Sequence, residues 1–308
     1  MKEQAMKSVY HRGEIAVQAQ AGVRGMAERV GRSIHTSFPL AAQEFLREQP
    51  MALIGSVNVE GRAWASLVTG EPGFLQVIDE QTLMIGAQAS SGDPLMDNLK
   101  ANAEVGLLAI EFATRRRMRV NGTAELHPEG IAIHAAQVYS NCPKYIQARA
   151  WRIENARSYN QQSQPSVERK LSLSEKQQMW IAESDTFFIA THHQDGGGDV
   201  SHRGGMPGFV RVVDRQMLAW GDYSGNTMFQ TLGNIVENPA AGLLFIDWER
   251  GSTLQLTGRA RVVWEPERFE MFAGAERAVE FAVDEVTEIP VATNLRWQLL
   301  DYSPFNPA

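Results

Sequence analysis

Three things are scarce in this sequence. Cysteine occurs once, at Cys142, which excludes an intrachain disulfide and a cysteine-built zinc site and fits a reducing compartment. Positive charge is not in excess, because 29 Lys and Arg stand against 36 Asp and Glu for a net charge of −7, which argues against a nucleic-acid partner. No stretch approaches the roughly 18 apolar residues of a membrane span. We therefore expect a cytoplasmic globular protein with no membrane segment.

An internal repeat is the strongest pattern present. Pro72-Gly73-Phe74 matches Pro207-Gly208-Phe209 at an offset of 135, and MRVNGTAEL (118–126) matches LQLTGRARV (254–262) at 136. Matches between these points keep the same order, with small shifts. Self-similarity of this kind predicts two homologous domains in one chain.

Each half has mostly the pattern of strands. Short alternating or β-branched runs are bounded by Gly, Pro, Asn or Asp, at 52–59, 63–70, 74–79 and 81–87, then at 187–193, 209–214 and 216–220. The long alternating segments beginning at 116 and 252 are predicted to end each β unit, and helices are predicted at 41–49, 93–103, 174–184 and 226–239. The fold class is therefore mainly β with flanking helices, as two small tandem barrels packed on one another. We divide the chain into an N-terminal helical extension (1–38), a first barrel (39–153), a polar linker (154–172) and a second barrel (173–308).

The two halves differ where the inserted helix is expected to begin. Ser224-Gly225-Asn226-Thr227 combines a flexible glycine with side-chain donors, which suits a phosphate at a helix N-terminus, although the same residues are ordinary helix caps. In the first half the segment is Ser91-Gly92-Asp93-Pro94. Asp93 repels a phosphate and Pro94 has no N–H to donate, so this half is predicted to start its helix without a ligand.

A second difference lies in a neighbouring strand. Leu67-Val68-Thr69-Gly70 corresponds to His202-Arg203-Gly204-Gly205 at the offset of 135. Arginine offers a permanent charge and a forked donor suited to phosphate, and the glycines permit close approach of a flat ligand. Taken alone, His202 is better explained as a hydrogen-bonded structural residue, but together with the helix start the strand favours ligand binding in the second half.

These residues, in this order, resemble the pyridoxamine 5'-phosphate oxidase family of FMN-binding split β-barrels. The likeness is carried by DVSHRGGMPGFVRVVD (199–214), GDYSGNTMFQTLGNIVENPAAGLLF (221–245) and LQLTGRARVVW (254–264). Segments 11–23, 141–147 and 294–307 extend it over nearly the whole chain. The resemblance implies two barrels with FMN in the groove between them, here as a pseudo-dimer within one chain.

The resemblance also assigns residues to the cofactor. Arg203, Gly204 and the segment Ser224, Gly225, Asn226 and Thr227 would hold the phosphate, with His202 beside them, while Trp220, Tyr223, Thr253 and Gln255 are candidates for lining the ring or ribityl chain. Trp248, in place of Phe112 of the other half, is a further candidate for flavin contact. Asn226-Thr227 stands where the classical oxidases carry Arg-Lys, and residues 295–302 lack the substrate-binding histidine of those enzymes, which argues against vitamin oxidation.

The sequence thus predicts flavin-dependent redox chemistry on a small organic substrate, with NAD(P)H as a candidate electron donor. Because the flavin ring supplies the chemistry, no catalytic side chain is assigned, and no metal is assigned to His192-His193. Three alternatives stay open: a haem-binding or haem-degrading member of the fold, using His192, His193 or His202; a non-catalytic flavin carrier; and an interaction module. Dimerisation of the whole chain is also open. Arg115-Arg116-Arg117 could reach a phosphate across the barrel interface, but a solvated hairpin is the favoured interpretation, and Cys142 is interpreted as a structural thiol.

Overall fold

A computed structural model describes residues 8–154, 167–194 and 196–307. The first half contains α1 (Arg12–Gln20), α2 (Arg24–Gly31), α3 (Leu40–Arg47), β1 (Met51–Val57), β2 (Ala63–Thr69), β3 (Leu75–Val77), β4 (Thr82–Ile85), α4 (Leu95–Ala101), β5 (Glu104–Glu111), β6 (Arg116–His127), β7 (Gly130–Ser140) and β8 (Ala148–Ile153). The second contains β9 (Glu168–Lys170), α5 (Glu175–Glu183), β10 (Thr186–His193), β11 (Gly197–Gly204), β12 (Val210–Asp214), β13 (Met217–Asp222), α6 (Gln230–Glu237), β14 (Ala240–Ile246), β15 (Thr253–Val263), η2 (Pro266–Arg268), β16 (Arg277–Ile289) and β17 (Leu295–Asp301).

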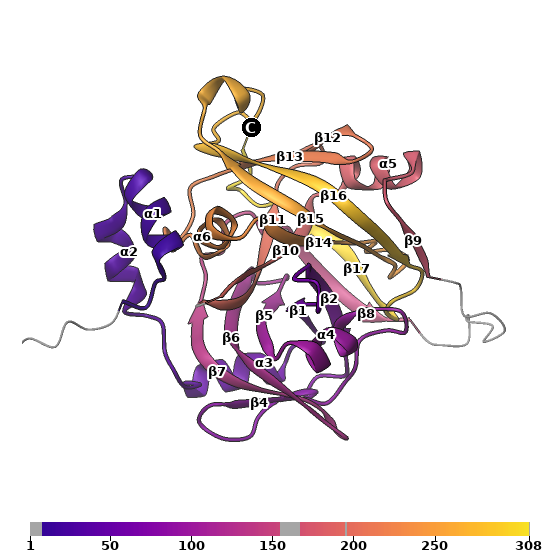
Figure 1. Cartoon of the computed structure of the whole chain (residues 1–308). Helices are drawn as coiled ribbons and strands as arrows, with labels where there is room; N and C mark the ends of the chain where they lie inside the picture. The colour runs from indigo at the N-terminus through magenta and orange to yellow at the C-terminus, as the bar shows by residue number, and fades with distance from the viewer. Residues whose placement is uncertain (1–7, 155–166, 195, 308) are drawn as a thin grey trace, which may run out of the picture.

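The repeat in the sequence is a repeat of topology. One sheet has the strand order β2-β1-β5-β6-β7-β4-β3 and the other β11-β10-β14-β15-β16-β13-β12, so every strand of the first has a counterpart at the same place in the second. Figure 1 shows the first half below and the second above. Neither strand path closes on itself. The predicted fold class, two mainly β units in tandem, is confirmed.

The sequence-based prediction for the end of each β unit was wrong. Two further long strands, β7 and β16, follow β6 and β15 and pair with them antiparallel. Their sequences begin as GIAIHAAQ and RAVEFAVD, whose patterns interrupt strict alternation. The pairing of β6 with β7 includes a bulge at Asn121/Gly122, and such bulges mask the two-residue period.

The two halves pack face to face through their longest apolar strands. In β1, Ala52 and Ile54 enter the core of the first half, while Met51 and Leu53 enter a third core shared with the second half. Successive strand residues point to opposite faces, so a continuous apolar run is what a strand buried on both faces requires. The prediction that the two halves cover each other within one chain is therefore confirmed, although neither sheet is a closed barrel.

Glycine permits the close approach of the two sheets. A Cβ on Gly106 of β5 would lie 2.6 Å from the Cα of Asp199, and one on Gly242 of β14 would lie 2.5 Å from the carbonyl oxygen of Ala63. Both distances are too short for any side chain. Beside this contact β8 pairs with β17, placing Trp151 opposite Trp297, so the ends of the two repeats also bind each other.

The N-terminal helices lie to one side, where α1 packs beside α6 (Figure 1). The two helices approach closely at Gly13, where an added Cβ would meet the carbonyl oxygen of Gly233 at 2.3 Å. Of the predicted linker 154–172, residues 155–166 lie outside the described residues, and Glu168–Lys170 forms β9 against β16. The domain boundaries remain predictions.

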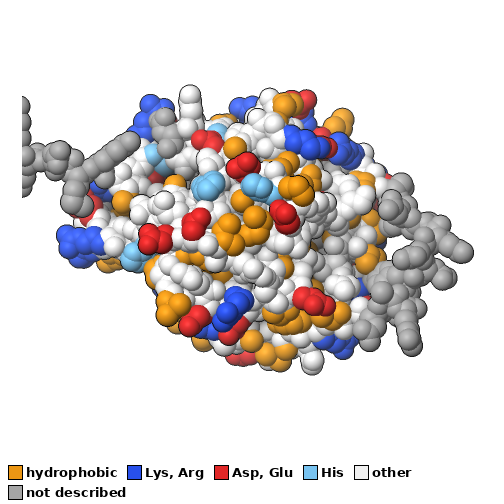
Figure 2. Space-filling view, turned by 90° about the horizontal axis from the view of Figure 1, so that it is seen from below, with side chains coloured by type: hydrophobic (Ala, Val, Ile, Leu, Met, Phe, Trp, Pro, Cys, Tyr) orange, Lys and Arg blue, Asp and Glu red, His pale blue; other side chains and the backbone are white. Residues whose placement is uncertain are grey.

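The face seen in Figure 2 carries acidic and basic side chains interspersed among apolar ones, without a continuous patch of either sign. Within the described ranges, no helix is long and apolar enough to cross a membrane.

Candidate functional site

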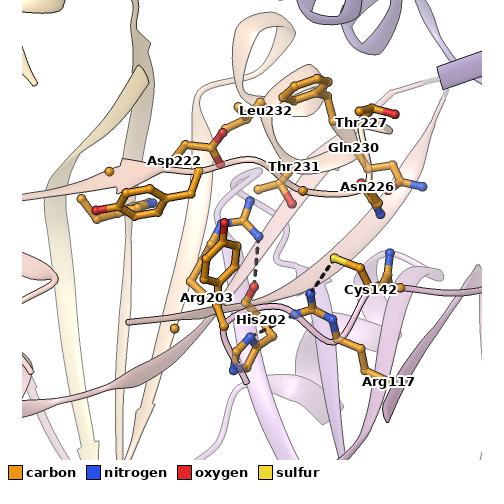
Figure 3. Close-up of a pocket in the computed structure, with 18 of the residues that line it drawn as sticks. Arg117, Cys142, His202, Arg203, Asp222, Asn226, Thr227, Gln230, Thr231 and Leu232 are labelled. Atoms are coloured by element: carbon orange, nitrogen blue, oxygen red, sulfur yellow. Dashed lines mark hydrogen bonds between the residues drawn. The ribbon is translucent and has the colours of Figure 1, made fainter. Parts of the chain in front are cut away.

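A small pocket opens where β11 and the β13–α6 loop of the second half meet β6 and the segment after β7 of the first half (Figure 3). It encloses about 100 Å³, room for a group the size of a few waters, such as a phosphate. The residues that line it are Arg117, Arg119, Asn141, Cys142, Tyr145, His202, Arg203, Gly204, Phe209, Trp220, Gly221, Asp222, Tyr223, Gly225, Asn226, Thr227, Phe229, Gln230, Thr231 and Leu232.

Three arginines converge on this pocket. Arg117 and Arg119 are two apart on β6 and so share one face of the strand, while Arg203 comes from β11. The guanidinium of Arg203 donates to Ser201 Oγ at 2.6 Å, and that of Arg119 donates to the same hydroxyl and to Asp199 Oδ1, the latter at 2.9 Å. Burial, and then the neighbouring cations, lower the pKa of Arg117 to about 10, so it stays charged at neutral pH.

His202 is a neutral member of the site. Burial, followed by the positive charge of Arg117, holds its pKa well below the ordinary value of 6.5. Arg117 Nη1 lies 3.0 Å from His202 Nδ1, and because a guanidinium can only donate, Nδ1 accepts and Nε2 carries the hydrogen. The imidazole therefore carries a buried N–H with no hydrogen-bond partner among the described residues, on the side of the ring that packs against Phe112 and Phe188.

Buried polar atoms without a hydrogen-bond partner gather around the pocket. Such atoms are costly unless a ligand or water completes them. Among the described residues that line it, they are Arg117 Nε, Arg119 Nε, Asn141 Oδ1 and Nδ2, His202 Nε2, Trp220 Nε1, Thr227 Oγ1 and Gln230 Nε2. Most are donors, which fits an anion.

The loop before α6 differs from the prediction. The helix was expected from residue 226, but α6 begins at Gln230, after Thr227 and Phe229 adopt left-handed backbone angles of φ 63° and 62°. These angles cannot continue a helix. Asn226 Oδ1 instead accepts from the Met228 N–H. Gln230 and Thr231 line the pocket and no side chain caps α6, so the helix still directs an open N-terminus toward the site.

A segment of the first half covers this loop from above. Tyr145 Oη donates to the Ser224 carbonyl oxygen at 2.9 Å, and Lys144 Nζ reaches the same oxygen at 3.5 Å. Ser224 thereby contacts the covering segment rather than lining the pocket. Cys142 Sγ lies 3.8 Å from Arg117 Nη2, so the single thiol borders the site and is half-buried.

The structure brings together most of the residues chosen from the sequence. His202, Arg203, Gly204, Trp220, Tyr223, Gly225, Asn226 and Thr227 all line the pocket, with Ser224 at its edge. Trp248 lies elsewhere, 4.5 Å from the Arg149 guanidinium and stacked edge-on against Trp297. Gln255 donates to Asp93 and to the Ala65 carbonyl oxygen, and Thr253 is buried on the same strand, away from the pocket.

For β6 the sequence favoured a solvated hairpin over a contact across the interface, and it did not single out Arg119. The hairpin interpretation holds for exposed Arg116, which pairs with Glu111, but is wrong for Arg117, which lines the pocket. Arg117 and Arg119 are the repeat counterparts of Thr253 and Gln255 at the offset of 136. When two repeats face each other, a strand of the opposite half completes the site of each half. The repeat offset could therefore have indicated Arg117 and Arg119 of β6 in place of Thr253 and Gln255.

Comparison with known proteins agrees with the repeat. The model of the family described as pyridoxamine 5'-phosphate oxidase matches residues 38–163 and again residues 173–294. These two segments make up most of the chain, which therefore belongs to this family. A search of curated proteins finds no match.

Some solved structures show a likeness to part of this chain. HupZ from Group A Streptococcus is 15% identical, covering 40% of this chain and 98% of its own, with a TM-score of 0.33. An FAD-binding protein from Mycobacterium smegmatis is 16% identical over 40% of this chain and 96% of its own, at a TM-score of 0.27. An F420 reductase is 20% identical, covering 34% of this chain and 90% of its own, with a TM-score of 0.25.

Proposed function

We propose that the pocket binds the phosphate of FMN and that the protein is a flavin-dependent oxidoreductase acting on a small organic molecule, with NAD(P)H as the electron donor. The observation that carries this proposal is the convergence of Arg117, Arg119 and Arg203 on a pocket lined by unsatisfied donors. Guanidinium forks suit the geometry of a phosphate.

The side chains present fit the group. Arg203 and Arg117 would supply charge, Thr227 Oγ1 a neutral hydrogen bond, and Tyr223 a flat flanking surface beside the loop, with His202 Nδ1 holding Arg117 in place. The carboxylates nearest the pocket are already engaged, since Asp199 binds Arg119 and Thr231, and Asp222 faces Arg203 and Arg277. When bound, the flavin ring accepts and delivers the electrons, and the protein positions it and tunes its electrostatics.

A titration with two ligands tests the proposal. FMN and riboflavin share the ring and ribityl chain and differ in the phosphate, so FMN should bind at least tenfold more tightly if the arginines hold a phosphate. Quenching of flavin fluorescence measures both affinities. Equal affinities would remove the phosphate assignment, and absence of FMN binding would remove the proposed cofactor.

Haem binding is the alternative function, and the absorbance spectrum of the protein distinguishes bound haem from bound flavin. His192 Nε2 lies 2.5 Å from Glu104 Oε2, and His193 stacks on His11 at 3.9 Å between ring centroids. His202 lies among four arginines, Arg117, Arg119, Arg149 and Arg203. We expect protein incubated with FMN and haem to show flavin bands after desalting, and a Soret band alone would reverse this assignment.

A further inference from the structure

One wall of the anion pocket is an irregular segment of the first half. This covering segment, residues 141–147, joins β7 to β8 without helix or strand. Its residues Asn141, Cys142 and Tyr145 line the pocket. Figure 3 shows the Cys142 thiol directed toward Arg117. The site of the second half is thus completed by a part of the first half that no sheet pairing holds in place.

The backbone on two sides of the pocket adopts left-handed angles. Tyr145 of the covering segment has φ 67°, and Thr227 and Phe229 of the loop before α6 have φ 63° and 62°. The two loops meet where Tyr145 Oη donates to the Ser224 carbonyl oxygen at 2.9 Å. Left-handed angles at residues with a side chain are unfavourable and persist only where surrounding contacts fix them. The conformation at Tyr145 therefore requires support from elsewhere in the fold.

A buried glutamine provides part of this support. The Gln147 side chain has no exposed surface, and its Nε2 donates to the Gly205 carbonyl oxygen, directly after β11, at 3.1 Å. Its Oε1 accepts from the Ser303 N–H at 2.8 Å and from Asn306 Nδ2 at 3.0 Å. Breaking these bonds would leave buried polar groups without partners, which is costly. Gln147 therefore ties the covering segment both to β11 and to the residues that follow β17.

The residues after β17 also hold the covering segment directly. We call residues 302–307 the clamp. Ser303 Oγ accepts from the Tyr145 N–H at 3.2 Å, so a hydroxyl of the clamp fixes the backbone at the left-handed residue. Arg115 Nη2 donates to the Tyr302 carbonyl oxygen at 3.1 Å and binds the clamp to the first half. The clamp does not line the pocket, so it acts on the pocket through Tyr145.

We propose that the clamp is a positioning element of the anion site, with Gln147 and Ser303 as the positioning residues. They hold Tyr145 in place. Through its bond to Ser224, Tyr145 in turn keeps the loop before α6 in the shape that surrounds a phosphate. The identity of this anion as the FMN phosphate rests on the proposed function, whereas the position of the covering segment is measured without flavin.

The single cysteine reports on the covering segment. Cys142 lies within it and is half-buried, so its alkylation by the neutral reagent iodoacetamide, followed by mass spectrometry, depends on how far this segment opens. In the flavin-free full chain, Ser303→Ala and Gln147→Leu should each raise the alkylation rate at least about threefold, the scale of one lost hydrogen bond. Ser303→Thr keeps the hydroxyl and should restore the wild-type rate. Gln298→Ala, an exposed glutamine of β17, is the matched control and should not change the rate.

Two further readouts separate positioning from a general role in stability. Ile54→Val weakens the core of the first half without touching the covering segment, so it should leave the alkylation rate unchanged. The ratio of FMN affinity to riboflavin affinity should fall at least about threefold in Ser303→Ala, because a displaced segment no longer surrounds the phosphate. A loss of overall stability would leave this ratio unchanged.

Three results would overturn the proposal. The first is an alkylation rate that is the same in the wild type, Ser303→Ala and Gln147→Leu. The second is an equal increase in Gln298→Ala or Ile54→Val. The third is an unchanged flavin ratio in Ser303→Ala when the wild type prefers FMN. If Gln147→Leu does not fold, Ser303→Ala, which removes one hydroxyl, decides the outcome. Failure of the proposed function is seen separately, as a wild type that binds FMN and riboflavin equally.

Discussion

The two halves hold equivalent sites in opposite states. In the second half, Arg119 donates to Ser201 and lines a pocket in which several donors have no partner among the described residues. In the first half, the counterparts Ser66 and Gln255 both bind the carboxylate of Asp93, Ser66 at 2.6 Å and Gln255 at 2.9 Å. In the first half a carboxylate at the helix start binds both donors, whereas in the second half the helix start has no carboxylate and Arg119 pairs with Asp199 of β11 instead.

The N-termini of α4 and α6 show the same difference between the two halves. Asp93 Oδ1 also accepts from the Leu95 N–H at 2.9 Å, so it caps the first turn of α4, whereas α6 has no side-chain cap. Burial raises the pKa of Asp93 to about 6, which leaves it mostly ionised at neutral pH. In the first half an acidic residue thus occupies the donors whose counterparts border the pocket of the second half.

The largest expected effect comes from giving the second half the residue of the first. Arg203→Val places the counterpart of Val68 in the pocket and removes a charge-assisted phosphate contact of about 1.5 to 3 kcal/mol. FMN affinity should fall by roughly 10- to 100-fold, with riboflavin affinity nearly unchanged, in fluorescence titrations. Arg116→Ala, an exposed arginine beside the site, is the control. Equal losses for both flavins would assign Arg203 to the ring or to folding.

The second-largest expected effect is on the pH dependence of folding stability, through Glu14 of α1, the helix that packs beside α6. Burial, and to a lesser degree the Asp199 charge, raise the pKa of Glu14 from 4.5 to about 8. Between these values the folded protein holds a proton that the unfolded chain has released, so stability falls as pH rises, by on the order of a few kcal/mol.

Urea unfolding at pH 6.5 and 8.5 measures this loss of unfolding free energy. Both pH values lie above the pKa of Asp93, which is about 6. Glu14→Gln should reduce it, and Glu28→Gln, an exposed glutamate of α2, should not. A wild-type protein equally stable at both values would contradict the buried, protonated state of Glu14.

A smaller effect is expected from neutralising the internal anion. Asp93→Asn keeps the side-chain shape but replaces one acceptor oxygen with an N–H₂ group that faces a donor, Ser66 or Gln255. We therefore expect the free energy of unfolding to fall by about 1 kcal/mol. FMN affinity should not change, because Asp93 lies in the other half's site. If FMN affinity shifted as much as in Arg203→Val, the two sites would not be independent.

The smallest effect tests a residue chosen from the sequence that the fold places elsewhere. Trp248→Phe introduces the residue of its repeat counterpart, Phe112, at a position that packs on Arg149. FMN affinity should stay within about twofold of the wild type, since a contact this far from the pocket contributes nothing to phosphate binding. A larger change in the same titration would return Trp248 to the site.

The repeat, the strands and the asymmetry of the two helix starts could be predicted because they depend on local pattern. The segment containing Arg203 and residues 223–227 could be found because it differs from its own copy. Arg117 and Arg119 could not be found by local pattern, since on β6 they look like residues of a solvated hairpin. Their burial arises only when the second half covers that strand.

The residue at which α6 begins could not be predicted from the local sequence either. Asn226 and Thr227 are ordinary capping residues, and a helix beginning there satisfies every local preference. The structure instead uses left-handed angles at Thr227 and Phe229, which carry the loop around the pocket before the helix begins. Such angles are found where tertiary contacts fix the backbone, often at functional sites.

The number of flavins bound per chain tests the central claim most directly. The protein is saturated with FMN, freed of excess ligand and denatured, and the released flavin is quantified by absorbance against protein concentration. One site open and one closed by Asp93 predicts one FMN per chain. Two FMN per chain would contradict the closed state of the first half, and none would contradict the phosphate pocket of the second.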